Sequence, residues 1–473
     1  MKVLEQLFER IAQRVNINLR EFHFNVHPYV EHLVPFEKLS NFYGFYGVSS
    51  QHPLDFKFLH SNLAGSYFLG KCRTTNSIVY KSDVRGDELK KKGAVFESQG
   101  FQIFLARDEG IRIEDSFLIK TLVHNHSHDP EHPERFPICN TIACRYCNIH
   151  GSPMDGSFLE PFATVDLTTM NDCVVGAFSY IQAGEVNHLR IAPGTIWVKS
   201  PGRFNFFYQY PKDSLRRYVQ FVPGFPAEGL LMDFVHERKE DFQRVFATVN
   251  GEAGIPVPGS ASVDRYAVIK PKTSISDNVL VAQRAFLENS RLGKGANAQE
   301  NCYIINSNLA GYDVTAHGAK VVEVDMGEMV FVGFNSFLRG RPDARLAIGR
   351  DSIIMPHTII DSDQPLHIPA GSLVWGLITG PDDLAKNSIS LEELRAVQGG
   401  FSRGRLFFEG SGSNFVDAFC QRIQHILEAN GAFYDGVSRK GHAQKNQNIS
   451  FNTIQPYSEG KRKGMFPTID ILP

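Results

Sequence analysis

The chain of 473 residues has little that would tie it to a membrane, to nucleic acid or to an oxidising compartment. It contains no apolar run of about 18 residues, so no segment is expected to span a bilayer. Its 49 basic and 51 acidic residues nearly cancel, which argues against nucleic acid as a partner and leaves a small-molecule ligand as the expectation. Seven scattered cysteines, an odd number, are typical of reduced thiols or a metal site. The first residues alternate charged and apolar side chains, unlike a signal peptide, so we expect a cytoplasmic protein.

What the chain does have, in its second half, is a set of runs in which apolar residues lie six positions apart. The clearest run is Ile269, Ile275, Val281 and Leu287. An amphipathic helix would need spacings of three and four, and a simple strand would alternate without a six-residue period. A period of six indicates a short strand followed by a turn, with three strands closing one triangular coil. The pattern therefore predicts a mainly β fold, a parallel β-helix built from hexapeptide repeats.

The same period, read along the whole chain, predicts five regions. A weaker form of it occurs in the first half, and amphipathic stripes and capping residues predict helices near both ends. The predicted regions are an N-terminal helical segment at 1–55, a first β-helical stretch at 56–200 with a His/Cys-rich insertion at about 124–150, an inserted loop and helix segment at 201–262, a second β-helical stretch at 263–380, and C-terminal helices with a polar tail at 381–473.

Four segments resemble one group of hexapeptide-repeat proteins. They are SIVYKSDVRGD (77–87), RLGKGANAQENCYI (291–304), DVTAHGAKVV (313–322) and IPAGSLVWGLITGP (368–381). Together they are similar to the γ-class carbonic anhydrases and their relatives, which include acyltransferases. The resemblance implies a left-handed parallel β-helix with N-terminal and C-terminal helices, and a homotrimer.

The resemblance also implies a set of site residues. In the γ-class family three histidines bind a metal, and Arg, Asp, Asn and Gln side chains organise the site. Positions that match are Arg85, Asp87, Asn297, Gln299 and His317, with Glu300 in place of the usual Asp. At the two other histidine positions of the second stretch the chain has Ile305 and Val322. The three-histidine site is therefore incomplete in that stretch.

One histidine suits general-base catalysis better than metal binding, because a catalytic zinc needs about three protein ligands. We therefore expect His317 to take a proton from an acceptor that attacks an acyl-CoA thioester, with Asn297, Gln299 and Glu300 orienting the acceptor or the imidazole. This makes the chain a candidate acyltransferase. One alternative is a γ-carbonic-anhydrase-like hydratase that holds zinc or another divalent metal through both stretches, for example with His126 and His317. Another is a β-helix scaffold without catalytic activity.

A second group of candidate residues lies in HNHSHDPEHPERFPICNTIACRYCNIHG (124–151). His124, His126 and His128 alternate, so on a strand they would face one side and could bind a metal. The spacing Cys144-x-x-Cys147-x-x-His150 also suits zinc ligands. The alternative interpretation is a polar loop with ordinary buried cysteines.

Overall fold

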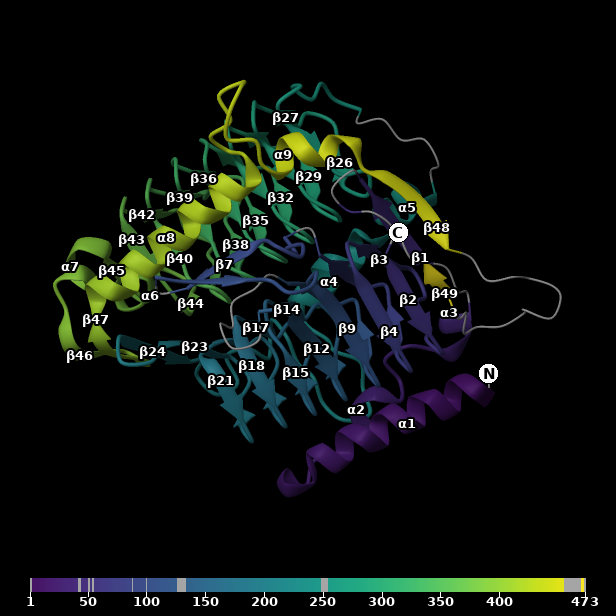
Figure 1. The fold of residues 1–473 in the computed structure, drawn as a ribbon. Coiled ribbons are helices and arrows are strands. Elements are labelled where there is room, and N and C mark those ends of the chain that lie inside the picture. Colours follow the sequence, from purple (N-terminus) through teal and green to yellow (C-terminus); the bar gives the residue numbers. More distant parts are fainter. Residues whose placement is uncertain are drawn as a thin grey trace. The chain divides into compact units, whose positions relative to one another are not determined.

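The computed structural model describes residues 2–40, 44–49, 52, 55–86, 88–98, 100–125, 133–247, 254–454 and 469–471 (Figure 1). The chain divides into two compact units. Unit 1 comprises 1–195, 216–229 and 449–473, and unit 2 comprises 196–215 and 230–448. Each unit is a left-handed parallel β-helix with three sheets, which confirms the predicted fold class. Among the described residues, no helix is both long and apolar enough to cross a bilayer.

The three sheets of unit 1 are built from strands of successive coils. The first sheet has the order β48 (Ser450–Ile454), β1 (Gly44–Val48), β3 (Ser66–Leu69), β6 (Asp83–Arg85), β11 (Leu122–His124), β14 (Asn148–His150), β17 (Thr164–Asp166), β20 (Tyr180–Gln182). The second has the order β5 (Ile78–Tyr80), β10 (Phe117–Ile119), β13 (Ile142–Ala143), β16 (Phe158–Leu159), β19 (Val174–Val175), β22 (Arg190–Ile191). The third has the order β49 (Ile469–Ile471), β2 (Phe56–Leu59), β4 (Cys72–Thr75), β9 (Gly110–Glu114), β12 (Arg135–Cys139), β15 (Met154–Asp155), β18 (Thr168–Asn171), β21 (Gly184–Asn187).

The N-terminal helices cover the second sheet of unit 1. They are α1 (Lys2–Asn18), η1 (Arg20–Phe22), α2 (His27–Val30) and α3 (Phe36–Ser40). Phe8 of α1 packs edge-on against Phe117, with ring centroids 6.0 Å apart, and Phe24 lies 5.3 Å from Phe158. The apolar stripe of α1 is buried in the same cluster. The apolar stripe of α1 therefore packs against the outer face of the second sheet of unit 1.

Unit 1 differs from the predicted regions in three places. The segment 1–55 contains the strand β1 as well as helices. Residues 133–150 form regular coil strands, and the described insertion is instead the antiparallel hairpin β7 (Val95–Ser98) and β8 (Phe101–Phe104) between β6 and β9. The C-terminal strands β48 and β49 pair antiparallel with β1 and β2, so they cover two strands that would otherwise be open sheet edges.

Unit 2 repeats the three-sheet plan more regularly. Its first sheet has the order β25 (Ser262–Val263), β28 (Leu280–Val281), β31 (Asn297–Ala298), β34 (Val314–Thr315), β37 (Phe331–Val332), β40 (Ile353–Ile354), β43 (Ser372–Val374), β45 (Ser388–Ser390). The second has the order β26 (Val268–Ile269), β29 (Phe286–Glu288), β32 (Tyr303–Ile305), β35 (Lys320–Val322), β38 (Phe337–Arg339), β41 (Ile359–Asp361), β44 (Leu377–Ile378). The third has the order β27 (Ser274–Ile275), β30 (Arg291–Leu292), β33 (Asn308–Leu309), β36 (Val324–Met326), β39 (Leu346–Ile348), β42 (Leu366–Ile368).

The six-residue period corresponds to the interior of unit 2. Ile275, Val281 and Leu287 all lie in one buried aliphatic cluster that runs through the coils. Leu287 pairs in register with Ile304, and Ile304 pairs with Val321, so the central coils repeat every 17 residues. The interior column that the period predicts is therefore present.

The remaining elements of unit 2 lie outside its three β-helix sheets. They are β23 (Thr195–Ser200), β24 (Phe204–Gln209), α4 (Leu230–Glu237), α5 (Lys239–Ala247), α6 (Pro381–Lys386), α7 (Leu391–Arg395), β46 (Gln398–Arg403), β47 (Leu406–Ser411), α8 (Gly412–Asn430), α9 (His442–Lys445) and η2 (Asn446–Asn448). Ser390 accepts a hydrogen bond from the Glu393 N–H and so caps the start of α7. Helix α8 ends at Gly431, which adopts the left-handed conformation. The region 201–262 was expected to be an inserted loop and helix segment, and it contains strand β24, which pairs antiparallel with β47.

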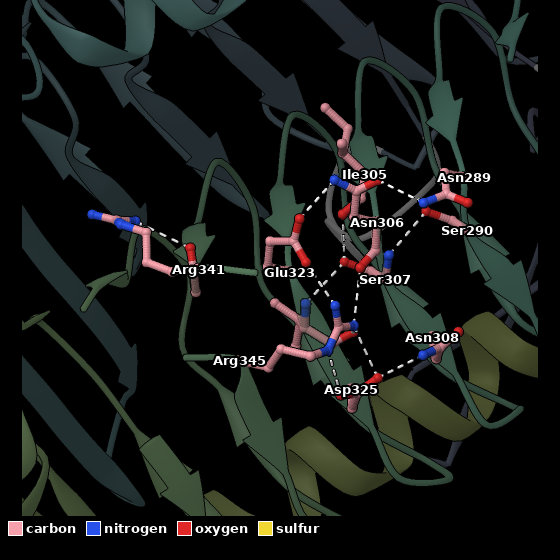
Figure 2. Close-up of polar contacts among 12 residues, drawn as sticks. Asn289, Ser290, Ile305, Asn306, Ser307, Asn308, Glu323, Asp325, Arg341 and Arg345 are labelled. Atoms are coloured by element: carbon pink, nitrogen blue, oxygen red, sulfur yellow. Dashed lines mark hydrogen bonds and ion pairs between the residues drawn. The ribbon is translucent and has the colours of Figure 1, made fainter. Parts of the chain in front are cut away.

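One corner of unit 2 is joined from coil to coil by polar side chains (Figure 2). Asn289 Nδ2 donates to Asn306 Oδ1 at 2.9 Å, and Asn306 Nδ2 donates to Glu323 Oε1 at 2.6 Å. The Arg345 guanidinium then binds Glu323 Oε2 at 2.6 Å and Asp325 Oδ2 at 2.7 Å. This ladder fixes the register of four successive coils beside the aliphatic column.

Candidate functional site

The site in unit 2 is centred on the predicted residues His317 and Glu300. His317 lies in the turn between β34 and β35, and Glu300 lies 17 residues earlier, at the same corner of the preceding coil. Both residues are buried, with His317 2% and Glu300 5% exposed, and His317 Nδ1 lies 2.7 Å from Glu300 Oε2. The Gly318 N–H donates to the Glu300 carbonyl at 2.9 Å, which ties the two turns together. The coil length therefore places the imidazole directly against the carboxylate.

This contact indicates which nitrogen of His317 carries the proton when the imidazole is neutral. A carboxylate beside Nδ1 favours the tautomer that carries its proton there, so Nε2 is the basic nitrogen. The Phe334 ring lies beside the imidazole, with centroids 5.1 Å apart, and the Arg422 guanidinium of α8 lies 5.8 Å from the centroid of the Phe334 ring. The turn itself requires Gly318, whose φ is +73° and whose added Cβ would lie 2.2 Å from Asn335 Oδ1. The imidazole is thus held from several sides.

Asn297 and Gln299 lie on the same coil as Glu300. Asn297 is in β31 and 1% exposed, and neither atom of its amide group has a hydrogen-bond partner within the described part of the chain. Gln299 is half-buried, and its backbone N–H donates to the Thr315 carbonyl at 3.0 Å. A buried amide without partners costs about 1–3 kcal/mol, so Asn297 is a candidate ligand-binding group.

Lys320 is a residue near this turn that the sequence interpretation missed. It is 2% exposed on β35, and its Nζ donates to the Gly318 carbonyl at 2.5 Å. Burial lowers the pKa of this ammonium to about 7. The Tyr303 ring lies 5.8 Å from Nζ. The signal that could have revealed it is a lysine among the hydrophobic residues of a coil strand, where a charged side chain is unexpected.

Unit 1 carries a second group of polar residues, in register on four adjacent strands. The strand pairing places Arg85 beside His124, His124 beside His150, and His150 beside Asp166. Asp166 is fully buried and His150 is 8% exposed. His150 Nδ1 lies 2.8 Å from Asp166 Oδ1, and the Tyr180 hydroxyl donates to the other oxygen of the same carboxylate. The inward neighbours of these residues are apolar, so the four polar side chains share the outer face of the sheet.

The residues that the sequence predicts around a metal do not all lie together in the structure. Asp87, His126 and His128 lie outside the described residues. Cys144 is buried in the cluster beneath the N-terminal helices, whereas Cys147 Sγ contacts the Glu160 carbonyl at 3.1 Å. Burial raises the pKa of both thiols, the opposite of what zinc thiolates require. Among the described residues, Cys144, Cys147 and His150 do not form a set of three adjacent ligand atoms.

Comparisons with known proteins agree with this architecture. Residues 101–223 match the family model "Hexapeptide repeat including loop". A crystal structure titled "putative acetyltransferase" from Desulfovibrio desulfuricans G20 is 52% identical, with a TM-score of 0.93, and the match covers 100% of this chain and 99% of that chain. "Bifunctional protein GlmU" from Rhizobium rhizogenes is 26% identical over 153 residues, which is 31% of this chain and 32% of that protein. The match thus spans about a third of this curated relative. The chain belongs to the hexapeptide-repeat transferase superfamily.

Proposed function

We propose that this protein transfers an acyl group from a coenzyme A thioester to a hydroxyl or amine of a small-molecule acceptor. The observation that carries the proposal is the contact between His317 Nδ1 and Glu300 Oε2, at 2.7 Å in a buried turn. An imidazole oriented by a carboxylate is the arrangement that general-base catalysis of acyl transfer requires. Membership of a transferase superfamily and the acetyltransferase title of the crystal structure at 52% identity support the same reaction class.

In the proposed reaction His317 Nε2 removes the proton of the acceptor hydroxyl or amine. The acceptor oxygen or nitrogen then attacks the thioester carbonyl carbon, and the carbon–sulfur bond breaks. The departing thiolate takes the proton back from the imidazolium, which yields the acylated acceptor and free coenzyme A. Glu300 stabilises the imidazolium while it carries the proton. General-base assistance of this kind contributes about 10²–10⁴ to the rate.

Asn297 has the second role in the proposal. Its amide can donate to the carbonyl oxygen of a bound acyl group or accept from the acceptor, and it has no hydrogen-bond partner among the described residues. Gln299 follows two residues later on the same coil. We propose that both side chains hold substrate beside the imidazole. Their loss would then weaken substrate binding more than it slows the proton transfer.

The test is release of free coenzyme A from a panel of short acyl-CoA thioesters, with hydroxyl and amine acceptors, by purified full-length protein. His317→Gln should lower kcat/KM at least about 100-fold and Glu300→Gln about 10- to 100-fold, because each removes part of the base. His367→Gln is the matched control, since that histidine is exposed on another face of unit 2 and should leave kcat/KM unchanged. Full activity in His317→Gln would overturn the proposed mechanism. Absence of both turnover and thermal stabilisation by coenzyme A would instead favour a non-catalytic scaffold.

We propose a homotrimer as the assembly, because the sheets of a β-helix present flat lateral faces that identical chains can bury against one another. Light scattering coupled to size exclusion should give a mass about three times the 53.0 kDa of the chain. A monomeric mass at micromolar concentration would reject this assembly without bearing on the chemistry at His317.

A further inference from the structure

Lys320 occupies a position that the other coils of unit 2 fill with apolar or aromatic side chains. It lies on β35, and its in-register neighbours on the other strands of the second sheet are Val268, Phe286, Tyr303, Phe337, Ile359 and Leu377. Lys320 is 2% exposed, and a buried ammonium is costly because it gives up its hydration. Since the neighbouring coils form without a charged residue at this position, the fold itself does not require the lysine.

The surroundings of Lys320 are aromatic. Tyr303 and Phe337 flank it in the sheet, and Phe234 of α4 packs edge-on against both rings, with centroids 5.4 and 5.9 Å apart. The centroid of the Tyr303 ring lies 5.8 Å from Lys320 Nζ. The amine is therefore enclosed beneath α4 and does not act as a solvated surface charge.

The amine of Lys320 instead contacts the turn that carries His317. Its Nζ donates to the carbonyl oxygen of Gly318, the residue after His317, at 2.5 Å. The Gly318 N–H donates to the Glu300 carbonyl at 2.9 Å, so the turn is held from both sides of this glycine. Burial lowers the pKa of the ammonium to about 7, and the charged and neutral amine both carry N–H groups that can donate to the carbonyl.

The coil of His317 also differs from its neighbours at the turn itself. The residue with a left-handed backbone at this corner carries a side chain in the adjacent coils, where it is Arg284, Asn301, Asn335 or His357. In the coil of His317 it is Gly318, and an added Cβ there would lie 2.2 Å from Asn335 Oδ1. Proteins depart from the local rules of their fold mainly at functional sites. Two such departures, a glycine and a buried lysine, occur together beside His317.

We propose that Lys320 is a positioning residue for His317. By holding the Gly318 carbonyl it fixes the turn, so that Nδ1 of the imidazole stays on Glu300 and Nε2 faces the substrate. This inference rests on the proposed function, because it concerns how the base of that reaction is aimed. In this role Lys320 neither touches the substrate nor exchanges a proton with it. A displacement of about 1 Å at a catalytic group can cost about 100-fold in rate, which sets the scale of the expected effect.

The first test is coenzyme A release by the full-length protein and its variants. Lys320→Met keeps the apolar stem and removes the donor. It should lower kcat about 10- to 100-fold and leave KM within about twofold, because the position of the base affects the transition state more than substrate binding. Lys320→Gln retains an N–H donor on a shorter stem and should show a smaller fall in kcat.

Phe337→Leu is the matched control, since Phe337 is buried in the same row one coil later and pairs in register with Lys320. It removes buried contacts without touching the turn, so kcat should be unchanged. An unchanged kcat in Lys320→Met, or an equal fall in Phe337→Leu, would overturn the inference while the loss of activity in His317→Gln upholds the proposed function.

The second test needs no turnover. In protein that contains ¹⁵N-labelled histidine, the ring-nitrogen signals of His317 are assigned by their loss in His317→Gln, and they report which nitrogen carries the proton. Lys320→Met should shift these signals and Phe337→Leu should not. If the wild-type protein transfers no acyl group, the proposed function fails, and these signals still decide whether Lys320 positions the imidazole. Identical His317 signals in wild type and Lys320→Met would overturn the inference. Circular dichroism establishes folding, and Lys320→Gln replaces Lys320→Met in both tests if the latter does not fold.

Discussion

The polar ladder at the corner of unit 2 allows a quantitative prediction for Arg345→Met. The guanidinium binds Glu323 Oε2 at 2.6 Å, Asp325 Oδ2 at 2.7 Å and the Asn306 carbonyl at 2.9 Å, so one side chain joins three coils (Figure 2). Methionine retains most of the apolar stem and removes only the charge and the donors. The substitution therefore isolates the contribution of the polar contacts to stability.

The exposure of the two carboxylates sets the magnitude. The Glu323 side chain is 10% exposed, so its hydrogen bond to a charged partner contributes about 1.5–3 kcal/mol. The Asp325 side chain is 45% exposed, and solvent screening reduces that pair to about 0.2–1 kcal/mol. Glu323 keeps its hydrogen bond from Asn306 in the variant, which limits the loss. We expect Arg345→Met to lower the free energy of unfolding of unit 2 by about 2–4 kcal/mol.

The assay is urea unfolding followed by circular dichroism, together with hydrogen exchange. Exchange is needed because two units can unfold separately, and a repeat coil opens with its neighbours first. Protection should fall most in the peptides that contain Asn306 and Asp325. Arg350→Met is the matched control, since the Arg350 side chain is 70% exposed and pairs with the half-exposed Asp351, so it should cost less than about 1 kcal/mol. Equal effects of the two substitutions would refute the argument that burial decides the contribution.

Three further predictions concern residues buried inside unit 2. Burial raises the pKa of Asp313 to about 7, so between about pH 4 and 7 the folded state holds a proton that the unfolded state has lost. Stability therefore falls as the pH rises through this range, by at most about 1.4 kcal/mol per pH unit. In urea titrations Asp313→Asn should remove this slope. For Lys320 the dependence of stability on pH has the opposite sign, because burial lowers its pKa to about 7 and the unfolded state binds more protons above that pH. Lys320→Met should therefore remove a rise of stability between about pH 7 and 10, and an unchanged slope would contradict the assignment. In Gly293→Ala the new Cβ would lie 1.9 Å from the Ala310 carbonyl oxygen, so the melting temperature should fall by an amount equivalent to about 3 kcal/mol.

The sequence predicted the interior of the fold better than its connections. Leu287 and Ile304 mark the column because every coil must fill the same interior space, and this requirement leaves a period in the chain. The hairpin β7–β8 adds strands that do not contribute to that column, so no period reveals it. Strand β48 was missed for a different reason, since its partner β1 lies about 400 residues earlier and no local pattern encodes such pairing.

Of the two candidate groups of site residues, one could be identified from the sequence and the other could not. His317 and Glu300 are one coil apart at a corner, so a coil of constant length brings them together and the resemblance could identify both. His124 and His150 are 26 residues apart, which is not the length of one regular coil, and their register follows from strand pairing alone. The sequence therefore assigned them to two different metal sets. Whether the chain is a hydratase, as the resemblance to γ-class carbonic anhydrases allows, stays a prediction.

The 17-residue spacing between Glu300 and His317 has a consequence for how such chains can change. Duplication or deletion of a whole coil leaves the aliphatic column continuous, so the architecture tolerates changes of length in steps of one coil. The proposed catalytic pair does not share this tolerance, because one extra coil inserted between the two turns would separate the carboxylate from the imidazole by roughly 4.8 Å more, the spacing of neighbouring strands. A duplicated coil should therefore be compatible with folding, but between Glu300 and His317 it would abolish the proposed catalysis. A lineage of such proteins can lengthen freely at either end while that interval stays fixed.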